Sequence, residues 1–374
     1  MLSQYPTEAV PAAKRIWFIS DTHLGVRNSS AEWIEIIDEY FEQFFFPTVQ
    51  EHLRPGDILI HAGDFYDSRQ SVNLRVLDQG VRITERLANT FSEGVWMLVG
   101  NHDIFGKNSN EINSLKSLKW IPGIRVCEDP LTLQAGPSSV FLMPWRKDNE
   151  DLQTTLDGAA PHDYLVCHAD IQGLKYNKYA TLDKHGTEVA RFRKFGQVFN
   201  GHIHYGQRQG NVLTLGCPYE LTRSDMDNQK GIYLLDLATR EMKFFPNDVS
   251  PKFKKMSFNW ILEQTLEDLN LQFHNNFVDI IIDPQIALKA PLHLLTDAVE
   301  TPRRLEFHPH DPTQNTTSSL HFDPESGTKP LTFDVMHFLH RYVDQMDLTP
   351  EDGHKIKSVL EKLHQLSTEM PLSN

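Results

Sequence analysis

Near its N-terminus the chain reads Ile16-Trp17-Phe18-Ile19-Ser20-Asp21-Thr22-His23, a short apolar run that ends in a carboxylate and an imidazole. An apolar run of this length, rich in β-branched and aromatic residues, is typical of a buried strand. Asp21 and His23 are two residues apart, so in extended backbone their side chains point to the same side. A carboxylate oxygen and an imidazole on one side favour Mn, Fe or Zn over a calcium cage.

Four further apolar runs along the first 204 residues end in the same way. The runs are Ile58–Ile60, Val95–Val99, Tyr164–Cys167 and Gln197–Phe199, and they lead into Gly63-Asp64, Gly100-Asn101-His102-Asp103, His168 and Gly201-His202-Ile203-His204. Ligand sites in open α/β sheets gather beyond the carboxyl ends of the strands, so we expect these side chains to meet at one edge of one sheet. The pattern predicts a two-metal hydrolase site with the ligands Asp21, His23, Asp64, Asn101, His168, His202 and His204.

Each motif has a simpler interpretation when it is taken alone. Asp64 would serve equally well as a helix cap, and His168 as a core histidine with satisfied hydrogen bonds. Asp103 would serve as a turn residue. The metal site is favoured because five such motifs, each at a strand end, do not arise together by chance.

Composition and charge narrow the class of protein. The 374 residues are 40% hydrophobic with a net charge of −14, which argues against a protein that coats nucleic acid by itself. A nuclease stays possible, because bound divalent cations reverse the field at a site. The sequence has no stretch of membrane-spanning length and no signal-peptide core, and its three cysteines form no disulfide framework, so we expect a cytoplasmic protein, or a host-cytoplasmic one if a phage encodes it.

The order of elements predicts an α/β class. A helical apolar pattern from Trp33 to Phe45 follows the first motif, and a second from Val72 to Thr90 lies between the second and third. Further strands are expected at Ser139–Met143, Val212–Leu215 and Gly231–Leu237. The predicted domains are 1–245, a smaller domain at 246–311 with a strand at Phe277–Ile282 and a helical stretch at Leu292–Val299, a linker at 312–331, and a helical hairpin at 332–374. The apolar face of the hairpin packs either on the body of the protein or on a partner.

The complete set of motifs resembles the calcineurin-like metallophosphoesterases. The resemblance implies a layered fold with two central mixed β-sheets flanked by helices. It also implies that one metal takes Asp21, His23, Asp64 and His204, and that the other takes Asp64, Asn101, His168 and His202, with Asp64 bridging. Two divalent ions are expected, with Mn²⁺ favoured and Mg²⁺ as the alternative.

Three further segments indicate the branch of this superfamily. They are Met143-Pro144-Trp145, Gly216–Thr222 and Gly231–Asp236, and they look like segments of the SbcD nucleases and of phage recombination endonuclease subunits related to the eukaryotic meiotic recombination nuclease. The resemblance implies a nuclease domain, a small α+β capping domain that helps to bind DNA, and a C-terminal helical hairpin that binds an SbcC-type coiled-coil ATPase. It also implies a homodimer, for which Trp33–Phe46 and the segment after Asp103 are candidate surfaces.

The expected activity is hydrolysis of DNA phosphodiesters, by exonuclease or endonuclease action, in double-strand-break repair and recombination. His102 lies next to the ligand Asn101 and is free to face the substrate, so it is expected to protonate or stabilise the leaving sugar oxygen. Asp67 is expected to orient His102, with a solvated turn residue as the alternative. Two other functions remain open: a small-molecule phosphodiesterase or phosphatase, and a non-catalytic scaffold for the ATPase.

Overall fold

The computed structural model describes residues 5–106, 109–182, 186–282 and 302–309, together with Lys355, Lys357 and Ser358. The chain divides into two compact units, Met1–Thr313 and Gln314–Asn374. The predicted helical stretch at 292–299, the linker at 312–331 and, apart from those last three residues, the hairpin at 332–374 lie outside the described residues. No helix in the described part of the chain combines the length and hydrophobicity that crossing a membrane requires.

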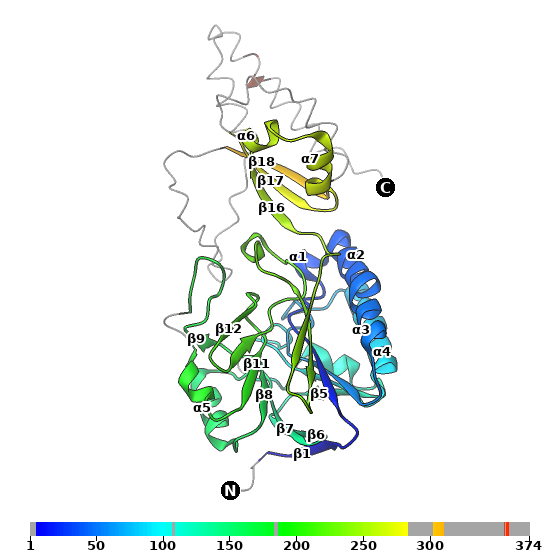
Figure 1. Ribbon diagram of the computed structural model, residues 1–374, viewed down its shortest axis with the longest axis vertical. Helices are drawn as coiled ribbons and strands as arrows, with labels where there is room; N and C mark the ends of the chain where they lie inside the picture. Colours follow the sequence, from blue (N-terminus) through cyan, green and yellow to red (C-terminus); the bar gives the residue numbers. More distant parts are fainter. Residues whose placement is uncertain are drawn as a thin grey trace. The chain divides into compact units, whose positions relative to one another are not determined.

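Two mixed β-sheets form the centre of the first unit (Figure 1). The six-stranded sheet has the order β15 (Met242–Pro246), β14 (Gly231–Asp236), β2 (Arg15–Ile19), β3 (Asp57–His61), β4 (Val95–Leu98) and β5 (Ile124–Cys127). The seven-stranded sheet has the order β1 (Thr7–Val10), β6 (Leu131–Ala135), β7 (Ser138–Met143), β8 (Tyr164–Cys167), β11 (Gln197–Asn200), β13 (Val212–Thr214) and β12 (Gln207–Gln209). Strands β2 to β5 are parallel to one another, as are β7, β8, β11 and β13.

The five strands that precede the metal-ligand motifs are confirmed as β2, β3, β4, β8 and β11, each within one residue of its predicted ends. The expectation that they share one sheet is wrong, because β8 and β11 belong to the seven-stranded sheet. An apolar run shows that a strand is buried on both faces, but it carries no information about which sheet contains it. The loops after the two sets of strands nevertheless meet, since His202 N–H donates to both carboxylate oxygens of Asp21, at 2.9 and 3.1 Å.

Apolar side chains fill the space between the sheets and cover their outer faces. Phe18 of one sheet stacks on Phe199 of the other, with ring centroids 4.3 Å apart. The outer face of the six-stranded sheet packs against α2 (Ala31–Glu39), α3 (Phe46–His52) and α4 (Leu74–Thr90), and that of the seven-stranded sheet against α5 (Asn149–Gly158). Figure 1 shows α2, α3 and α4 on one side of the sheets and α5 on the other, so the layers are those of the predicted α/β architecture.

The helix predicted after the first motif continues through a π-helical segment, η1 (Tyr40–Phe45), which joins α2 to α3. The aromatic side chains of α2, η1 and the start of α3 are buried, and they are Trp33, Tyr40, Phe41, Phe44, Phe45 and Phe46. The aromatic side chains of Trp33–Phe46 therefore belong to the protein's own core, while Glu42 and Gln43 of the same segment are exposed. A dimer surface on this segment stays a prediction. The segment after Asp103, the other candidate, does expose apolar side chains at Phe105, Ile112 and Trp120.

A separate parallel sheet follows in the chain, made of β16 (Phe253–Ser257), β17 (Phe277–Ile282) and β18 (Arg304–Pro309). With α6 (Phe258–Leu262) and α7 (Leu266–Phe273) it has its own apolar core, formed by Phe258, Ile261, Leu269, Phe273, Val278 and Ile280. Arg223, which precedes β14 in the chain, pairs with Asp279 of β17 and Glu306 of β18, each at 2.7 Å. These ion pairs connect the three-stranded sheet to the segment before β14. The strand at 277–282 is thus confirmed, and the domain boundaries near 245 and 311 stay predictions.

The remaining elements are short. They are α1 (Val26–Ser29), η2 (Ser114–Leu118), β9 (Ile171–Gln172), β10 (Thr187–Glu188), η3 (Val189–Phe192) and η4 (Arg223–Asp225). Of these, β9 and β10 pair with each other beyond the end of β8, next to the metal-ligand motifs.

Candidate metal centre

The backbone is strained where the predicted ligands lie. Asp21, His23, Asp64 and His202 have φ angles of 54°, 47°, 55° and 72°, in the left-handed region that residues with a Cβ atom seldom adopt. Such conformations persist where the surrounding structure over-determines them, and they gather at functional sites. Four of the ten described non-glycine residues with a positive φ thus belong to the predicted ligand set.

Two glycines allow the loops to approach closely. A Cβ atom on Gly63 would lie 2.3 Å from Nδ1 of His168, and Gly63 also has a φ of +106°. A Cβ atom on Gly100 would lie 2.2 Å from the carboxylate of Asp64. The glycines of the Gly-Asp and Gly-Asn-His-Asp motifs are therefore required by the packing of the site.

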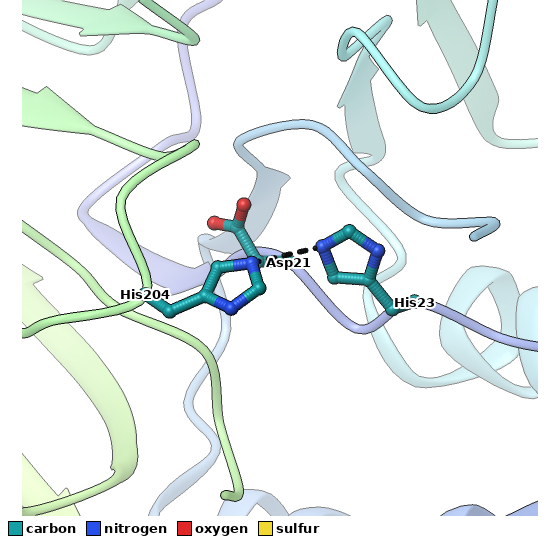
Figure 2. A group of neighbouring side chains, drawn as sticks. All are labelled: Asp21, His23 and His204. Carbon is teal, nitrogen blue, oxygen red and sulfur yellow. Dashed lines mark hydrogen bonds between the residues drawn. The ribbon is translucent and has the colours of Figure 1, made fainter. Parts of the chain in front are cut away.

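Asp21, His23 and His204 form the first cluster, drawn in Figure 2. Nε2 of His23 lies 3.1 Å from Nε2 of His204, and the Asp21 carboxylate lies beside both rings. His23 and Asp21 are almost fully buried, at 2% and 0% exposed. Three ligand atoms of the types that suit a transition metal therefore converge, two of them from buried residues and one from the half-buried His204.

Asp64, His168 and His202 form the second cluster, with Asn101 among them. Nε2 of His168 is 3.2 Å from Oδ2 of Asp64 and 2.9 Å from Oδ1 of Asn101. The same Asn101 oxygen is 2.8 Å from Nδ1 of His202. Turned the other way, the amide NH₂ would donate to both rings and to Asp64, and the amide oxygen would accept from Arg69 Nη2 at 2.7 Å. Coordination of a cation by Asn101 would require its oxygen on the side of the rings.

Asp64 lies between the two clusters. Its Oδ2 is 3.2 Å from His168 Nε2 and 3.7 Å from His23 Nε2, while Oδ1 accepts the His102 N–H at 2.7 Å. One carboxylate thus faces ligands of both clusters, and all seven side chains predicted as ligands are brought together.

Hydrogen bonds behind the rings determine which nitrogen faces the site. The far nitrogen of His23 is bonded to the Asp67 carboxylate at 3.0 Å, that of His168 to the Ala62 carbonyl at 2.8 Å, and that of His202 to the Asp170 carboxylate at 2.8 Å. Each acceptor holds a proton on the far nitrogen and leaves the other lone pair turned into the cluster. Lone pairs that converge on one another repel unless a cation lies among them, so this donor set fits bound metal ions.

The electrostatics of the site also favour cations. Burial alone would lower the pKa of His23, but the hydrogen bond to Asp67 and the charges of Asp64 and Asp21 outweigh it and raise the pKa to about 9. Burial would also lower the pKa of His168, but the charge of Asp64 and the hydrogen bond to it outweigh burial and raise that pKa to about 9. The same carboxylates that favour a proton on these rings would favour a divalent ion, which takes the place of the proton when it binds. Burial lowers the pKa of His204 to about 4, which keeps its ring neutral as a metal ligand must be.

His102 lies beside the clusters with its side chain 32% exposed. Its Nδ1 donates to the backbone carbonyl of Asp67 at 2.8 Å. The Asp67 carboxylate itself is 3.0 Å from His23 Nδ1 and 3.9 Å from His102 Nδ1. Asp67 thus positions both histidines, His23 through its side chain and His102 through its backbone.

Three residues near the site have roles that the motifs did not define. Asp103 accepts hydrogen bonds from the N–H groups of Tyr66 and Gly100, at 3.0 and 2.9 Å, and so holds two ligand loops together. Asp170 follows His168 by two residues, the same spacing as Asp21 and His23, and this spacing is the signal that would have found it. Arg69 places Nη2 2.7 Å from the amide of Asn101, and its Nε is buried with no protein partner among the described residues.

The site opens into a small cavity next to the second cluster. The cavity has a volume of about 160 Å³, and Trp145, Lys147, His168 and Asp170 are among the residues that line it. The ring of Trp145 is 5.1 Å from that of His202. A cavity of this size is smaller than a typical small-molecule pocket, so it admits only part of a large substrate.

Comparisons with known proteins agree with this geometry. The sequence model of one family, described as calcineurin-like phosphoesterase, matches residues 14–206, just over half of the chain. Over 245 residues the chain is 26% identical to exonuclease subunit 1 of Enterobacteria phage T4, covering 63% of this chain and 68% of the phage protein.

Two solved structures also align with the chain. An archaeal phosphodiesterase does so with 15% identity and a TM-score of 0.31, covering 62% of this chain and 99% of its own. A protein of unknown function from Aquifex aeolicus has 16% identity and a TM-score of 0.27, covering 55% and 83%. These TM-scores are too low to support a conclusion about the fold.

Proposed function

The chain belongs to the calcineurin-like phosphoesterase family, and on that premise we propose that it is a two-metal nuclease that hydrolyses DNA phosphodiester bonds. The observation that carries the proposal is the position of Asp64, whose Oδ2 faces His168 at 3.2 Å and His23 at 3.7 Å. A carboxylate that faces both ligand clusters can bridge two neighbouring cations and offset part of their mutual repulsion. The relative from phage T4, an exonuclease subunit by name, supports a nucleic acid as the substrate.

The proposed ligands follow the two clusters. One ion would be held by Asp21, His23, Asp64 and His204, and the other by Asp64, Asn101, His168 and His202. Mixed nitrogen and oxygen ligands suit Mn²⁺, with Mg²⁺ as the second candidate. When bound, the two ions would supply a hydroxide nucleophile and neutralise charge on the phosphate oxygens.

The chain's own residues then handle the leaving group and the orientation of the ligands. As the bond from phosphorus to the sugar oxygen breaks, His102 would protonate or stabilise that oxygen through Nε2, since Nδ1 is held by the Asp67 carbonyl at 2.8 Å. Asp67 and Asp170 keep His23 and His202 in the tautomers that binding requires. Arg69, whose buried Nε has no partner among the described residues, would add positive charge beside Asn101.

The cellular role and partners belong to the same proposal. The phage relative is named as one subunit of an exonuclease, which supports a partner subunit for this chain as well. We expect that partner to be an SbcC-type coiled-coil ATPase bound through residues 332–374, with a role in double-strand-break repair and recombination. We further expect a homodimer, and the exposed Phe105, Ile112 and Trp120 make the segment after Asp103 the preferred surface.

Digestion of end-labelled linear duplex and single-stranded DNA tests the proposed function. Wild-type protein should degrade DNA in Mn²⁺ and lose this activity in EDTA. The variant Asp64→Asn should be inactive with Mn²⁺ as well as with EDTA. The exposed carboxylate variant Asp157→Asn is the control, because Asp157 lies outside the clusters and pairs with Arg191 on the surface. Hydrolysis of a nitrophenyl phosphodiester without any action on DNA, even with an ATPase partner and ATP, would instead indicate a small-molecule phosphoesterase.

A further inference from the structure

A short hairpin leaves the metal centre directly after Asp170. It spans residues 171–182, with the sequence Ile171-Gln172-Gly173-Leu174-Lys175-Tyr176-Asn177-Lys178-Tyr179-Ala180-Thr181-Leu182. Its two sides are joined by backbone hydrogen bonds from Gly173 to Leu182, from Leu182 to Leu174 and from Tyr176 to Ala180, at 2.7 to 2.9 Å. Residues 175–180 form the tip of the hairpin. The side chain of Asn177 stabilises this tip by accepting hydrogen bonds from the N–H groups of Tyr179 and Ala180. The tip therefore has a defined shape before any partner binds.

The base of the hairpin is fixed to the body of the protein. Leu174 is fully buried in the core of the seven-stranded sheet. Gln207 of β12 accepts from the Lys175 N–H at 2.9 Å and donates to the Lys175 carbonyl at 2.6 Å. The hairpin also begins one residue after Asp170, which holds His202. Its position relative to the metal centre is thus set by side chains and not only by chain connectivity.

The tip presents aromatic and basic side chains to solvent. Tyr176 is 48% exposed and Tyr179 is 69% exposed, and Lys175 and Lys178 are exposed between and beside them. Lys178 pairs with Asp227, but both partners are on the surface, where such a pair contributes little. Two exposed rings and two cations thus lie within five residues on a chain whose net charge is −14.

We propose that this tip binds the single-stranded part of a DNA substrate and leads it to the metal centre, with bases stacked on Tyr176 and Tyr179 and phosphates paired with Lys175 and Lys178. Interleaved aromatic and basic side chains on a rigid support suit single-stranded nucleic acid, because every base has a face that can stack. A protein partner would be met better by an apolar patch without cations. The inference rests on the proposed nuclease function and names the substrate contact that would separate DNA from a small phosphodiester.

The test compares two substrates on the full-length protein in Mn²⁺: a labelled oligothymidylate and bis(p-nitrophenyl) phosphate, which carries no chain of bases and phosphates. For Tyr176→Ala/Tyr179→Ala, the ratio of kcat/KM on DNA to kcat/KM on the small diester should fall about 10-fold or more, through KM. Tyr176→Phe/Tyr179→Phe keeps both rings and should restore the ratio. Leu271→Ala, which alters an exposed apolar side chain on α7, is the matched control.

A second pair of variants tests the cations. Lys175→Gln/Lys178→Gln should reduce the salt dependence of KM for DNA, with the slope of log KM against log salt falling by about 1 to 1.5. An unchanged ratio in the double alanine variant, or a phenylalanine variant that fails to restore it, would overturn the proposal and leave the tip as a surface for a protein. A wild-type protein that hydrolyses only the small diester would overturn the nuclease function itself, so the two failures are distinguishable.

Discussion

Three histidines of the candidate site owe their orientation to groups that never face the metal ions. Asp67, the Ala62 carbonyl and Asp170 each bond the far ring nitrogen of a different histidine. Such outer partners fix the tautomer and strengthen the ring as a ligand. The affinity of the site for metal is therefore expected to depend on residues outside the ligand set.

Asp170→Ala should weaken one metal site and spare the other. The carboxylate is 2.8 Å from His202 Nε2, and loss of such a partner typically reduces metal affinity about 10- to 100-fold. Calorimetric titration with Mn²⁺ should then resolve one weakened and one unchanged site. Asp157→Ala is the control, and two sites of wild-type affinity in Asp170→Ala would contradict the positioning role.

His102→Ala should separate catalysis from metal binding. We expect both ions to be retained while kcat falls about 10²- to 10⁴-fold, the usual contribution of a general acid or base. Steady-state kinetics with Mn²⁺ stoichiometry measured on the same preparation would show this. Full activity would refute the assigned role. Loss of an ion would make His102 a ligand, since one of its ring nitrogens lies within 4.8 Å of a ring nitrogen of His23 and a carboxylate oxygen of Asp64.

Single residues differ in how far the sequence predicts them. The seven proposed ligands were identified because each follows an apolar run, and the structure brings all of them together. The acceptor at Ala62 could not be predicted, since it is a backbone carbonyl and leaves no trace in the residue type. Asp67 was linked to His102 alone, whereas its carboxylate faces His23, because spacing along the chain does not show which of two nearby rings a side chain meets.

Elements were predicted well where a strand or helix is buried along its length. The strand at Phe277–Ile282 matches β17, and the helix at Val72–Thr90 corresponds to α4, which begins two residues later. The π-helical η1 within the first long helix was not predicted. Its aromatic residues are buried like those of the α-helix before it, so the apolar pattern is similar for both kinds of turn.

One connection between elements should make stability depend on pH. Glu220 is 7% exposed and accepts the N–H of Phe253 at the start of β16, at 2.6 Å. Burial raises the pKa of Glu220 from 4.5 to about 7. The folded chain thus binds a proton more tightly than the unfolded one, so the unfolding free energy falls as pH rises from about 4.5 to about 7, by up to about 3 kcal/mol.

Glu220→Gln removes this titration while keeping an oxygen that can accept from Phe253. The variant should be more stable than wild type at pH 8 and similar to it at pH 4.5, as measured by urea denaturation at both values. If the unfolding free energies of variant and wild type differed by the same amount at both pH values, Glu220 would not be the cause of the pH dependence of stability.

Across the whole molecule, the site is assembled from two sheets. β2, β3 and β4 of one sheet and β8 and β11 of the other end at the same place, so the ligand atoms come from both sides of a shared apolar core. The sequence predicted the five strand ends and the α/β class, but not their division between sheets, which depends on pairings between distant segments. The predicted hairpin at 332–374 lies almost entirely outside the described residues.

The overall charge also has a consequence at this scale. A net charge of −14 opposes binding to DNA, so the proposed activity depends on local positive charge. Bound cations at the clusters, Arg69 beside them and the lysines of the 171–182 hairpin would supply it. Activity on DNA should therefore be more sensitive to salt than activity on a small diester.

The most direct test of the account is a crystal of the wild-type protein grown in Mn²⁺, with anomalous diffraction measured on both sides of the manganese absorption edge. The proposed two-metal site should give two anomalous peaks, one among Asp21, His23 and His204 and the other among Asn101, His168 and His202, with the Asp64 carboxylate between them. A single peak, or two peaks of which neither touches Asp64, would contradict the two-metal site on which the proposed function rests.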